Sequence, residues 1–396
     1  MNMGYRLTLL LALLAAALGV VTDLVAATAQ SGKGKKTVWI ISGQSNACGR
    51  GKLPGLEKDP LVEVFDGKAR QWAAAQDPLP GMNSEGVGPW QAAGVEVAGV
   101  SGMQVRLTGF ASGGQPISIW APGAVGYNAL MPIIQKNGKG ADVFLWYQGE
   151  SDANKKTPPE EYRTKLKELV AAVRSAAGNP KMTVVVVQLA HWTQGGGAEF
   201  MGIREAQRQF VLQDSHAIRV PALGCAAGDY VHLARDGYLQ LGKEIGRALL
   251  KTQYGAADVD WPGPVMDKAM LLADGKTVVA HFAEVAKLAG ATAGDFGVIP
   301  AGGTADKQLL AEKAEAGGTL VTLQFSAPIV LPARLVYGVG GNPKATLADE
   351  AGNAAPAVQL DLTPGAAPAD VPSAAPNGAG GAGTKAGAGG NAAKVP

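Results

Sequence analysis

Two short segments far apart in the sequence contain the residue types of a serine hydrolase. The first is Gly-Gln-Ser-Asn at residues 43–46, and the second is Asp-Tyr-Val-His at residues 229–232. Hydrolysis by serine needs a nucleophile on a tight turn, an imidazole that takes its proton and a carboxylate that orients the imidazole. A carboxylate three residues before a histidine can reach its Nδ1 across one turn. Ser45, Asp229 and His232 therefore form a candidate catalytic triad.

Each segment alone also has a simpler interpretation. A serine after a strand is often the N-cap of a helix, and Asp-x-x-His is common in ordinary turns. Few residues could act as the general base, because the chain has four histidines: His191, His216, His232 and His281. His191 follows an apolar run at residues 184–190, so we expect it either to contact substrate at the same sheet edge or to cap a loop. The other two are expected to be structural or exposed.

Two further segments can donate hydrogen bonds to an oxyanion. Ala-Ser-Gly-Gly at residues 111–114 can present backbone N–H groups closely, because glycines allow close approach. Trp-Tyr-Gln-Gly-Glu-Ser at residues 146–151 places the side-chain amide of Gln148 directly after an apolar run. Glycine pairs usually mark turns, so each segment alone is weak evidence. All four segments in this order, each after a strand-like run, are specific.

The elements that must position these residues are visible as apolar runs. Three runs are typical of strands buried on both faces of a parallel sheet: residues 37–41, 143–147 and 183–187. Residues 159–176 have apolar side chains at helical spacing, and this alternation predicts an α/β sandwich. Ligands bind such sheets at the carboxyl edge, where Gly43 lets the turn close without a side-chain clash. A last strand is expected at residues 220–225.

The sequence changes character after Tyr254, with Asp-Trp-Pro-Gly-Pro at residues 260–264 as the boundary. Short strands separated by glycine-rich turns are predicted beyond it, at residues 277–282, 319–325 and 333–337. We therefore expect four parts, namely a signal peptide at residues 1–29, a catalytic domain at 30–255, a small β domain at 256–363 and a tail at 364–396. The tail is rich in Ala, Gly and Pro and is predicted to be disordered.

The N-terminus has the pattern of an export signal. Arg6 precedes an apolar run at residues 7–21, and Ala-Thr-Ala at residues 27–29 offers a cleavage site, which predicts a periplasmic or extracellular protein. The alternative is an uncleaved membrane anchor, although Thr22 and Asp23 interrupt the run. After cleavage no stable membrane association is expected.

The balance of charges and the two cysteines narrow the function classes. Thirty-five basic and 33 acidic side chains give a formal charge of +2, which offers no attraction for nucleic acid. Cys48 and Cys225 are too few for a disulfide scaffold. Both would lie at the end of the sheet that carries the triad, so a single bridge and two buried thiols are both open alternatives.

The four segments together resemble the sialate O-acetylesterase and carbohydrate esterase family six branch of the SGNH hydrolases. The matching blocks are Gly-Gln-Ser-Asn, Gly-Gly-x-Pro-Ile-x-x-Trp at residues 113–120, Trp-Tyr-Gln-Gly-Glu-Ser and Asp-x-x-His, within about residues 37–250. The resemblance implies an α/β fold in three layers, α/β/α, with a flavodoxin-like parallel sheet. It also implies a small all-β domain after it.

The resemblance also implies an acyl-enzyme mechanism without a metal or other cofactor. Ser45 would attack an acetyl carbonyl, His232 would act as base and then acid, and Asp229 would orient it. The oxyanion would be bound by the backbone N–H groups of Ser45 and Gly114 and by the side chain of Gln148.

Four neighbours of these groups are expected to contact substrate or to orient the catalytic residues: Gln44, Asn46, Glu150 and His191. The expected substrate is an O-acetylated carbohydrate, either sialic acid or a polysaccharide such as xylan. Two alternatives stay open, an inactive carbohydrate-binding protein and a general lipase or thioesterase of the same fold.

Overall fold

The computed structural model describes residues 34–195 and 197–365, which form two compact units. The first unit extends to Pro262 and includes Gly340–Asn342, and the second comprises the remaining chain from Gly263. Each unit has its own hydrophobic core. The expected signal peptide and nearly all of the expected disordered tail lie outside the described residues.

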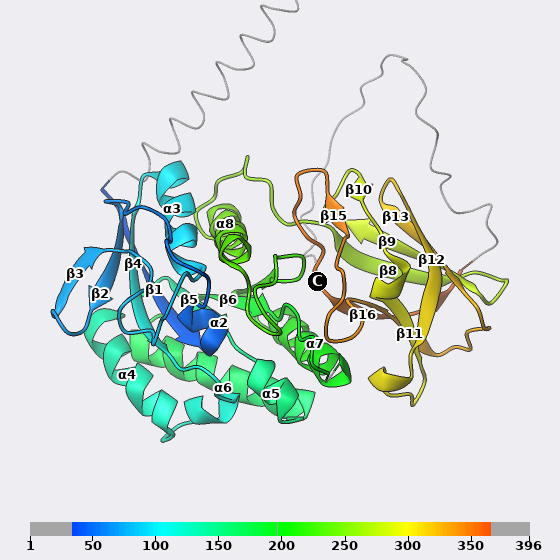
Figure 1. Cartoon of the computed structure of the whole chain (residues 1–396), viewed down its shortest axis with the longest axis horizontal. Coiled ribbons are helices and arrows are strands. Elements are labelled where there is room, and N and C mark those ends of the chain that lie inside the picture. The colour runs from blue at the N-terminus through cyan, green and yellow to red at the C-terminus, as the bar shows by residue number, and fades with distance from the viewer. Residues whose placement is uncertain (1–33, 196, 366–396) are drawn as a thin grey trace, which may run out of the picture. The chain divides into compact units, whose positions relative to one another are not determined.

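The first unit is built on a seven-stranded sheet with the order β3-β2-β4-β1-β5-β6-β7 (Figure 1). Its strands are β1 (Lys36–Gly43), β2 (Val62–Asp66), β3 (Gln71–Ala74), β4 (Gln104–Ala111), β5 (Val143–Tyr147), β6 (Thr183–Gln188) and β7 (Ala217–Pro221). All neighbouring strands are parallel except the antiparallel pair β2 and β3. The three strands expected from continuous apolar runs are confirmed as β1, β5 and β6.

The expected residue range of the last strand is wrong. We expected it at residues 220–225, but β7 is Ala217–Pro221 and a turn follows, in which Cys225 N–H donates to Ala222 O at 3.3 Å. Ala222 and Leu223 are buried in that turn. Because a buried turn is as apolar as a strand, composition alone did not mark where β7 ends.

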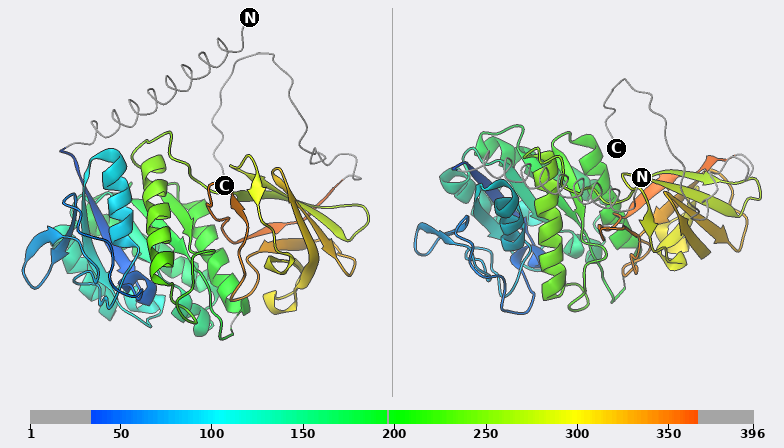
Figure 2. Two further views of the ribbon diagram at one scale, coloured as in Figure 1. Left: turned by 45° about the horizontal axis from the view of Figure 1, so that its top comes forward. Right: turned by 90° about the horizontal axis from the view of Figure 1, so that it is seen from above.

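Helices cover both faces of this sheet (Figures 1 and 2). The longer helices are α3 (Trp90–Ser101) and α8 (Arg235–Thr252) on one face, and α4 (Val125–Asn137), α6 (Pro159–Ala177) and α7 (Gly197–Gln213) on the other. Three short helical segments follow strand ends: α2 (Ser45–Cys48), η1 (Ile117–Trp120) and α5 (Glu150–Asn154). The three-layer α/β/α architecture is therefore confirmed, as is the helix expected at residues 159–176.

The second unit consists mainly of strands. Its eight-stranded sheet has the order β16-β14-β11-β12-β13-β9-β8-β17, and a separate pair joins β10 to β15. The bounds are β8 (Val265–Leu271), β9 (Thr277–Ala283), β10 (Leu288–Ala289), β11 (Phe296–Pro300), β12 (Leu309–Gly317), β13 (Leu320–Phe325), β14 (Ala333–Tyr337), β15 (Ala348–Asp349), β16 (Val358–Asp361) and β17 (Thr363–Pro364), with short helices η2 (Ala293–Asp295) and η3 (Ala305–Lys307). The three expected strands correspond to β9, β13 and β14.

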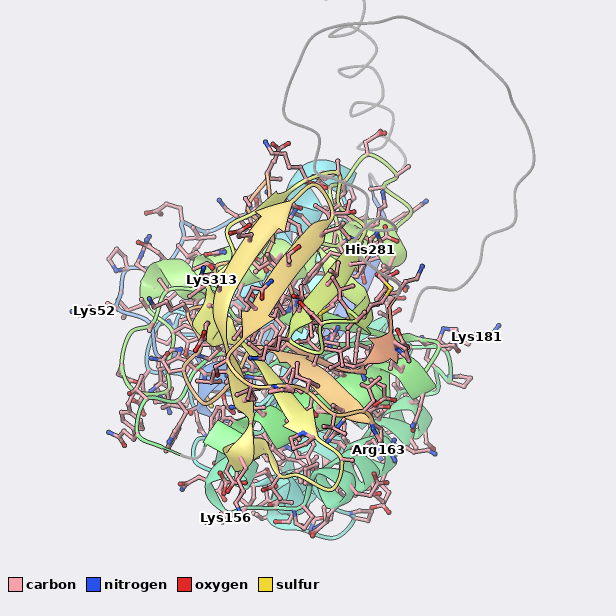
Figure 3. All side chains as sticks on the ribbon, turned by 90° about the vertical axis from the view of Figure 1, so that its right-hand side faces the viewer. Lys52, Lys156, Arg163, Lys181, His281 and Lys313 are labelled. Atoms are coloured by element: carbon pink, nitrogen blue, oxygen red, sulfur yellow. The ribbon has the colours of Figure 1, made fainter. Side chains whose placement is uncertain are left out.

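One of the four histidines lies in this second unit. Figure 3 labels His281, which belongs to β9, and its Nδ1 lies 2.6 Å from Asp267 Oδ1 on β8. This cross-strand contact accounts for His281 as a structural residue, as expected.

Both cysteines are buried free thiols. Burial raises the pKa of Cys48 to about 11 and that of Cys225 well above its usual range. Of the two alternatives for these residues, the structure therefore shows buried thiols. Within residues 34–195 and 197–365, no helix combines the length and the apolar character that crossing a membrane requires.

A buried carboxyl group in the first unit makes stability depend on pH. Asp77 is 6% exposed, and burial raises its pKa to about 7. In the unfolded chain an aspartate ionises near pH 3.9, so the free energy of unfolding should fall as pH rises from about 4 to 7. The free energy of unfolding of Asp77→Asn, relative to that of the wild type, should therefore be larger at pH 8 than at pH 5. Denaturant unfolding at both pH values measures this, with Asp258→Asn at an exposed position as control. An identical pH dependence in wild type and Asp77→Asn would contradict it.

Candidate active site

Three adjacent strands end at the same level on the carboxyl edge of the sheet. In the parallel register Gly43, the last residue of β1, lies beside Ala111 of β4 and Tyr147 of β5. The chain continues from β1 to strands on one side of it and later returns to strands on the other side. Such a change of direction is where open α/β sheets bind ligands. The loops after these three strands contain the first three sequence segments.

The nucleophile segment turns sharply after β1. Gly43 has φ 142°, and a Cβ at this position would lie 2.1 Å from Tyr147 O, so the expected need for glycine is confirmed. Gln44 N–H donates to the same oxygen at 3.0 Å. Ser45 is then the first residue of the short helix α2, whose N-cap is Gln44. The simpler interpretation of Ser45 as an N-cap is therefore wrong.

The side chains of the candidate triad are in contact. His232 Nε2 lies 2.9 Å from Ser45 Oγ, and Asp229 Oδ2 lies 2.8 Å from His232 Nδ1. Asp229 Oδ1 accepts the backbone N–H groups of Val231 at 2.8 Å and His232 at 2.7 Å. Partial burial would raise the pKa of Asp229, but these hydrogen bonds and the imidazole outweigh it and lower the pKa. The ionised carboxylate can hold the imidazole with Nε2 towards Ser45, which is the arrangement of a general base.

His191 supports the loop that carries Asp229 and His232. Its Nε2 lies 2.9 Å from the backbone oxygen of Asp229, and the residue is 6% exposed. Burial lowers the pKa of His191, which favours a neutral ring that donates to this carbonyl. Of the two expected roles, the loop contact is the one that the structure shows.

Asn46 and Glu150 form a buried network behind the nucleophile. Asn46 Nδ2 donates to Glu150 Oε1 at 2.5 Å and to Val231 O at 3.1 Å, and Tyr238 OH lies 2.5 Å from Asn46 Oδ1. Burial raises the pKa of Glu150. The network ties the turn of Ser45 to residues 229–232, which we call the catalytic loop because it carries the candidate acid and base. Asn46 and Glu150 therefore help to position the candidate triad. Tyr238, in α8, was not singled out from the sequence.

Gln148 belongs to a second buried network. Its Nε2 lies 2.5 Å from Asp152 Oδ2, 3.1 Å from Gln115 O and 3.2 Å from Gln44 Oε1. Gln44 Oε1 also accepts the N–H of Ser151 at 3.1 Å. All three neighbours of Nε2 are acceptors and an amide has two hydrogens, so both are engaged here. The oxyanion role of Gln148 stays a prediction, and Asp152 is a site residue that the sequence analysis missed.

The backbone of the glycine pair packs against the nucleophile. A Cβ on Gly113 would lie 3.5 Å from Ser45 Cβ and 3.1 Å from Arg50 Nη2, and Gly114 has φ 70°. Within the described part of the chain, the N–H groups of Ser45 and Gly114 donate to no protein acceptor. Both expected backbone donors therefore remain available for an oxyanion.

Groups of three or more His, Cys, Asp or Glu side chains that could hold a metal ion do not occur among the described residues.

Comparisons with known proteins identify carbohydrate esterases as similar proteins. A family model described as "Carbohydrate esterase, sialic acid-specific acetylesterase" matches residues 35–251. A probable carbohydrate esterase of Arabidopsis thaliana is 28% identical over 239 residues, which are 54% of this chain and 90% of that protein. The crystal structure of a carbohydrate acetylesterase from Xanthomonas citri has a TM-score of 0.64 at 19% identity, covering 82% of this chain and 80% of that chain. At this identity the structural likeness concerns the fold.

Proposed function

Because the chain belongs to the family described as carbohydrate esterase, sialic acid-specific acetylesterase, we propose that it is a serine esterase that removes O-acetyl groups from carbohydrates. The observation that carries this proposal is the contact of 2.9 Å between Ser45 Oγ and His232 Nε2, with Asp229 on the other ring nitrogen. A nucleophile, a base and an orienting carboxylate in this geometry support acyl transfer.

The proposed reaction has two steps and uses no metal or cofactor. Ser45 Oγ attacks the acetyl carbonyl while His232 Nε2 takes the serine proton, and the N–H groups of Ser45 and Gly114 bind the negative oxygen. The ester bond then breaks, and His232 returns the proton to the sugar oxygen as the sugar leaves. In the second step His232 deprotonates a water molecule, which attacks the carbonyl of the acetyl-enzyme. The bond between the acetyl group and Ser45 Oγ then breaks, His232 returns the proton to Ser45 Oγ, and acetate leaves.

The proposed substrate is an O-acetylated sialic acid or an acetylated polysaccharide such as xylan. We also propose that the protein acts after export, following removal of residues 1–29. The complete triad geometry argues against an inactive carbohydrate-binding protein. A general lipase or thioesterase is the remaining alternative, and it differs from the proposal in the alcohol or acyl group that it accepts.

One experiment separates these functions. Acetate release is measured from acetylated xylan and from O-acetylated sialic acid, beside cleavage of a long-chain fatty acid ester, with a fluorophosphonate probe to label an active serine. We expect labelling that Ser45→Ala abolishes, and acetate release from at least one carbohydrate. Labelling with cleavage of only the long-chain ester would identify a lipase, and absence of labelling would identify a binding protein.

The assignment of Gln148 to the oxyanion hole is tested by Gln148→Ala. A lost oxyanion donor costs about 10² to 10³ in turnover with little effect on ground-state binding. For Gln148 to act in this way, one hydrogen of its amide must turn from Gln115 O or Gln44 Oε1 to the oxyanion as the negative charge forms. Loss of this donor should lower turnover in the stated range at a nearly constant KM. The melting temperature should also fall, because Asp152 and Gln115 lose a buried donor.

Asp152→Asn is the matched control for this prediction, since it changes the same network but leaves the amide of Gln148 in place. It should lower the melting temperature while retaining most of the turnover. If Gln148→Ala also retained its turnover, Gln148 would be a purely structural residue, and the backbone donors alone would bind the oxyanion.

A further inference from the structure

An aromatic side chain is exposed in the middle of the catalytic loop. Tyr230 follows Asp229 directly and is 42% exposed, whereas the next residue, Val231, is 5% exposed. A single exposed apolar residue is common on protein surfaces. This one lies between the acid and the base of the triad, so its ring borders the place where the substrate reacts.

Tyr230 is the outer member of a row of three rings, which we call the aromatic ladder. Its ring meets that of Trp192 edge-on, with centroids 5.4 Å apart and an interplanar angle of 84°. Trp192 in turn stacks on Phe200 at 5.6 Å and 30°. Phe200 is 1% exposed and belongs to the core, in α7. The ladder therefore holds the exposed ring of Tyr230 against a fixed support.

The backbone of the catalytic loop is held by contacts that do not involve this ring. Tyr230 O accepts the N–H of Thr193 at 3.0 Å, and Asp229 Oδ1 accepts two N–H groups of the same loop. Among the described residues, the hydroxyl group of Tyr230 makes no hydrogen bond. Removal of the ring would therefore leave these hydrogen bonds of the loop in place.

The chemistry of the reaction indicates which part of the substrate meets the ring. His232 must deliver a proton to the leaving oxygen, so the alcohol part of the ester lies beside the imidazole. The ring centroid of Tyr230 is 6.4 Å from that of His232. In a carbohydrate ester the alcohol part is a sugar ring, which has a face of C–H groups. Tyrosine offers such a face a large and rigid contact area at a small cost in conformational entropy.

We propose that Tyr230, supported by Trp192, is the surface on which the sugar ring of the substrate stacks, and that it makes the enzyme prefer acetate esters of cyclic sugars to those of open-chain alcohols. This inference rests on the proposed function, and it assigns the side of the site that recognises the sugar. Tyr230 is a specificity residue because it contacts the alcohol part of the ester and takes no part in the transfer of the acetyl group.

The test compares two acetate esters that differ in the alcohol. The first is a fully acetylated methyl pyranoside, and the second is glycerol triacetate, which has the same acyl groups on an open chain. Tyr230→Ala should lower kcat/KM for the pyranoside about 3- to 10-fold, mainly through KM. The loss for glycerol triacetate should be clearly smaller. Tyr230→Phe retains the ring and should keep the preference of the wild type.

A control for exposure alone is Leu212→Ala, at the C-terminal end of α7, because Leu212 is 39% exposed. It should leave the ratio of the two kcat/KM values unchanged. Equal losses on both esters in Tyr230→Ala would show that the ring positions the catalytic loop, and no loss on the pyranoside would show that the sugar binds elsewhere. Either result overturns the inference. A wild type that cleaves glycerol triacetate but no sugar acetate would instead overturn the proposed function.

Discussion

Ser45→Ala and His232→Ala should each lower turnover by roughly 10³ to 10⁶ while leaving the fold intact. Ser45 Oγ is the attacking atom, and His232 Nε2, 2.9 Å away, is the atom that takes its proton. Neither residue can act without the other. The double variant should therefore be little slower than either single variant.

The measurement is initial-rate kinetics on the best acetylated substrate, with circular dichroism and melting temperature to show that each variant is folded. Residual activity should come from transition-state binding by the backbone N–H groups of Ser45 and Gly114, which both substitutions leave in place. A Ser45→Ala variant with most of its activity would contradict the mechanism. Losses that multiply in the double variant would show that the two residues act independently.

Asp229→Asn should lower turnover by about 10² to 10⁴, the upper end being the loss known for the equivalent change in a serine protease. Asp229 Oδ1 accepts two backbone N–H groups, so an amide at this position keeps its oxygen there and points its NH2 group at His232 Nδ1. Nδ1 must then be the acceptor and the proton must be on Nε2. A ring with its proton on Nε2 cannot take the proton of Ser45.

Asp236→Asn is the control, because Asp236 is an exposed carboxylate shortly after the catalytic loop. We expect it to keep the turnover of the wild type, and we expect Asp229→Asn to keep the wild-type melting temperature. Turnover in Asp229→Asn close to that of the wild type would show that another group orients His232.

The parts of the fold that could be predicted are those in which buried positions are occupied by a continuous run of apolar residues. β1, β5 and β6 lie inside the sheet, so both of their faces are apolar and the runs are continuous. β2 (Val62–Asp66) was missed because it contains Glu63, which forms an ion pair at 2.8 Å with Arg106 of the adjacent strand β4. A charged residue in a strand suggests exposure when the strand's sequence is considered alone. The partner that allows it to be partly buried lies in the neighbouring strand.

The site divides in the same way. The contacts within the candidate triad could be predicted, because Asp229 and His232 are three residues apart and Ser45 follows the first strand of the sheet. Tyr238 and Asp152 could not, because neither lies in a segment whose residue types suggest chemistry. Tyr238 reaches Asn46 across 192 positions of sequence. Asp152 accepts hydrogen bonds from Gln148 and from the backbone of Ile117. The contact with Ile117, 35 residues away in the sequence, is visible only in three dimensions.

The distance along the chain between Ser45 and His232, 187 residues, has a consequence for how activity arises during synthesis and folding. Ser45 follows β1 and His232 follows β7, which are the first and the last strand of the sheet in chain order. A growing chain therefore presents its serine without a base until nearly the whole catalytic unit has been translated. Contacts of this range form late in folding, since they require the intervening chain to be closed into a loop. Regain of esterase activity after dilution from denaturant is thus a measure of complete assembly of the first unit, whereas recovery of helical signal is not.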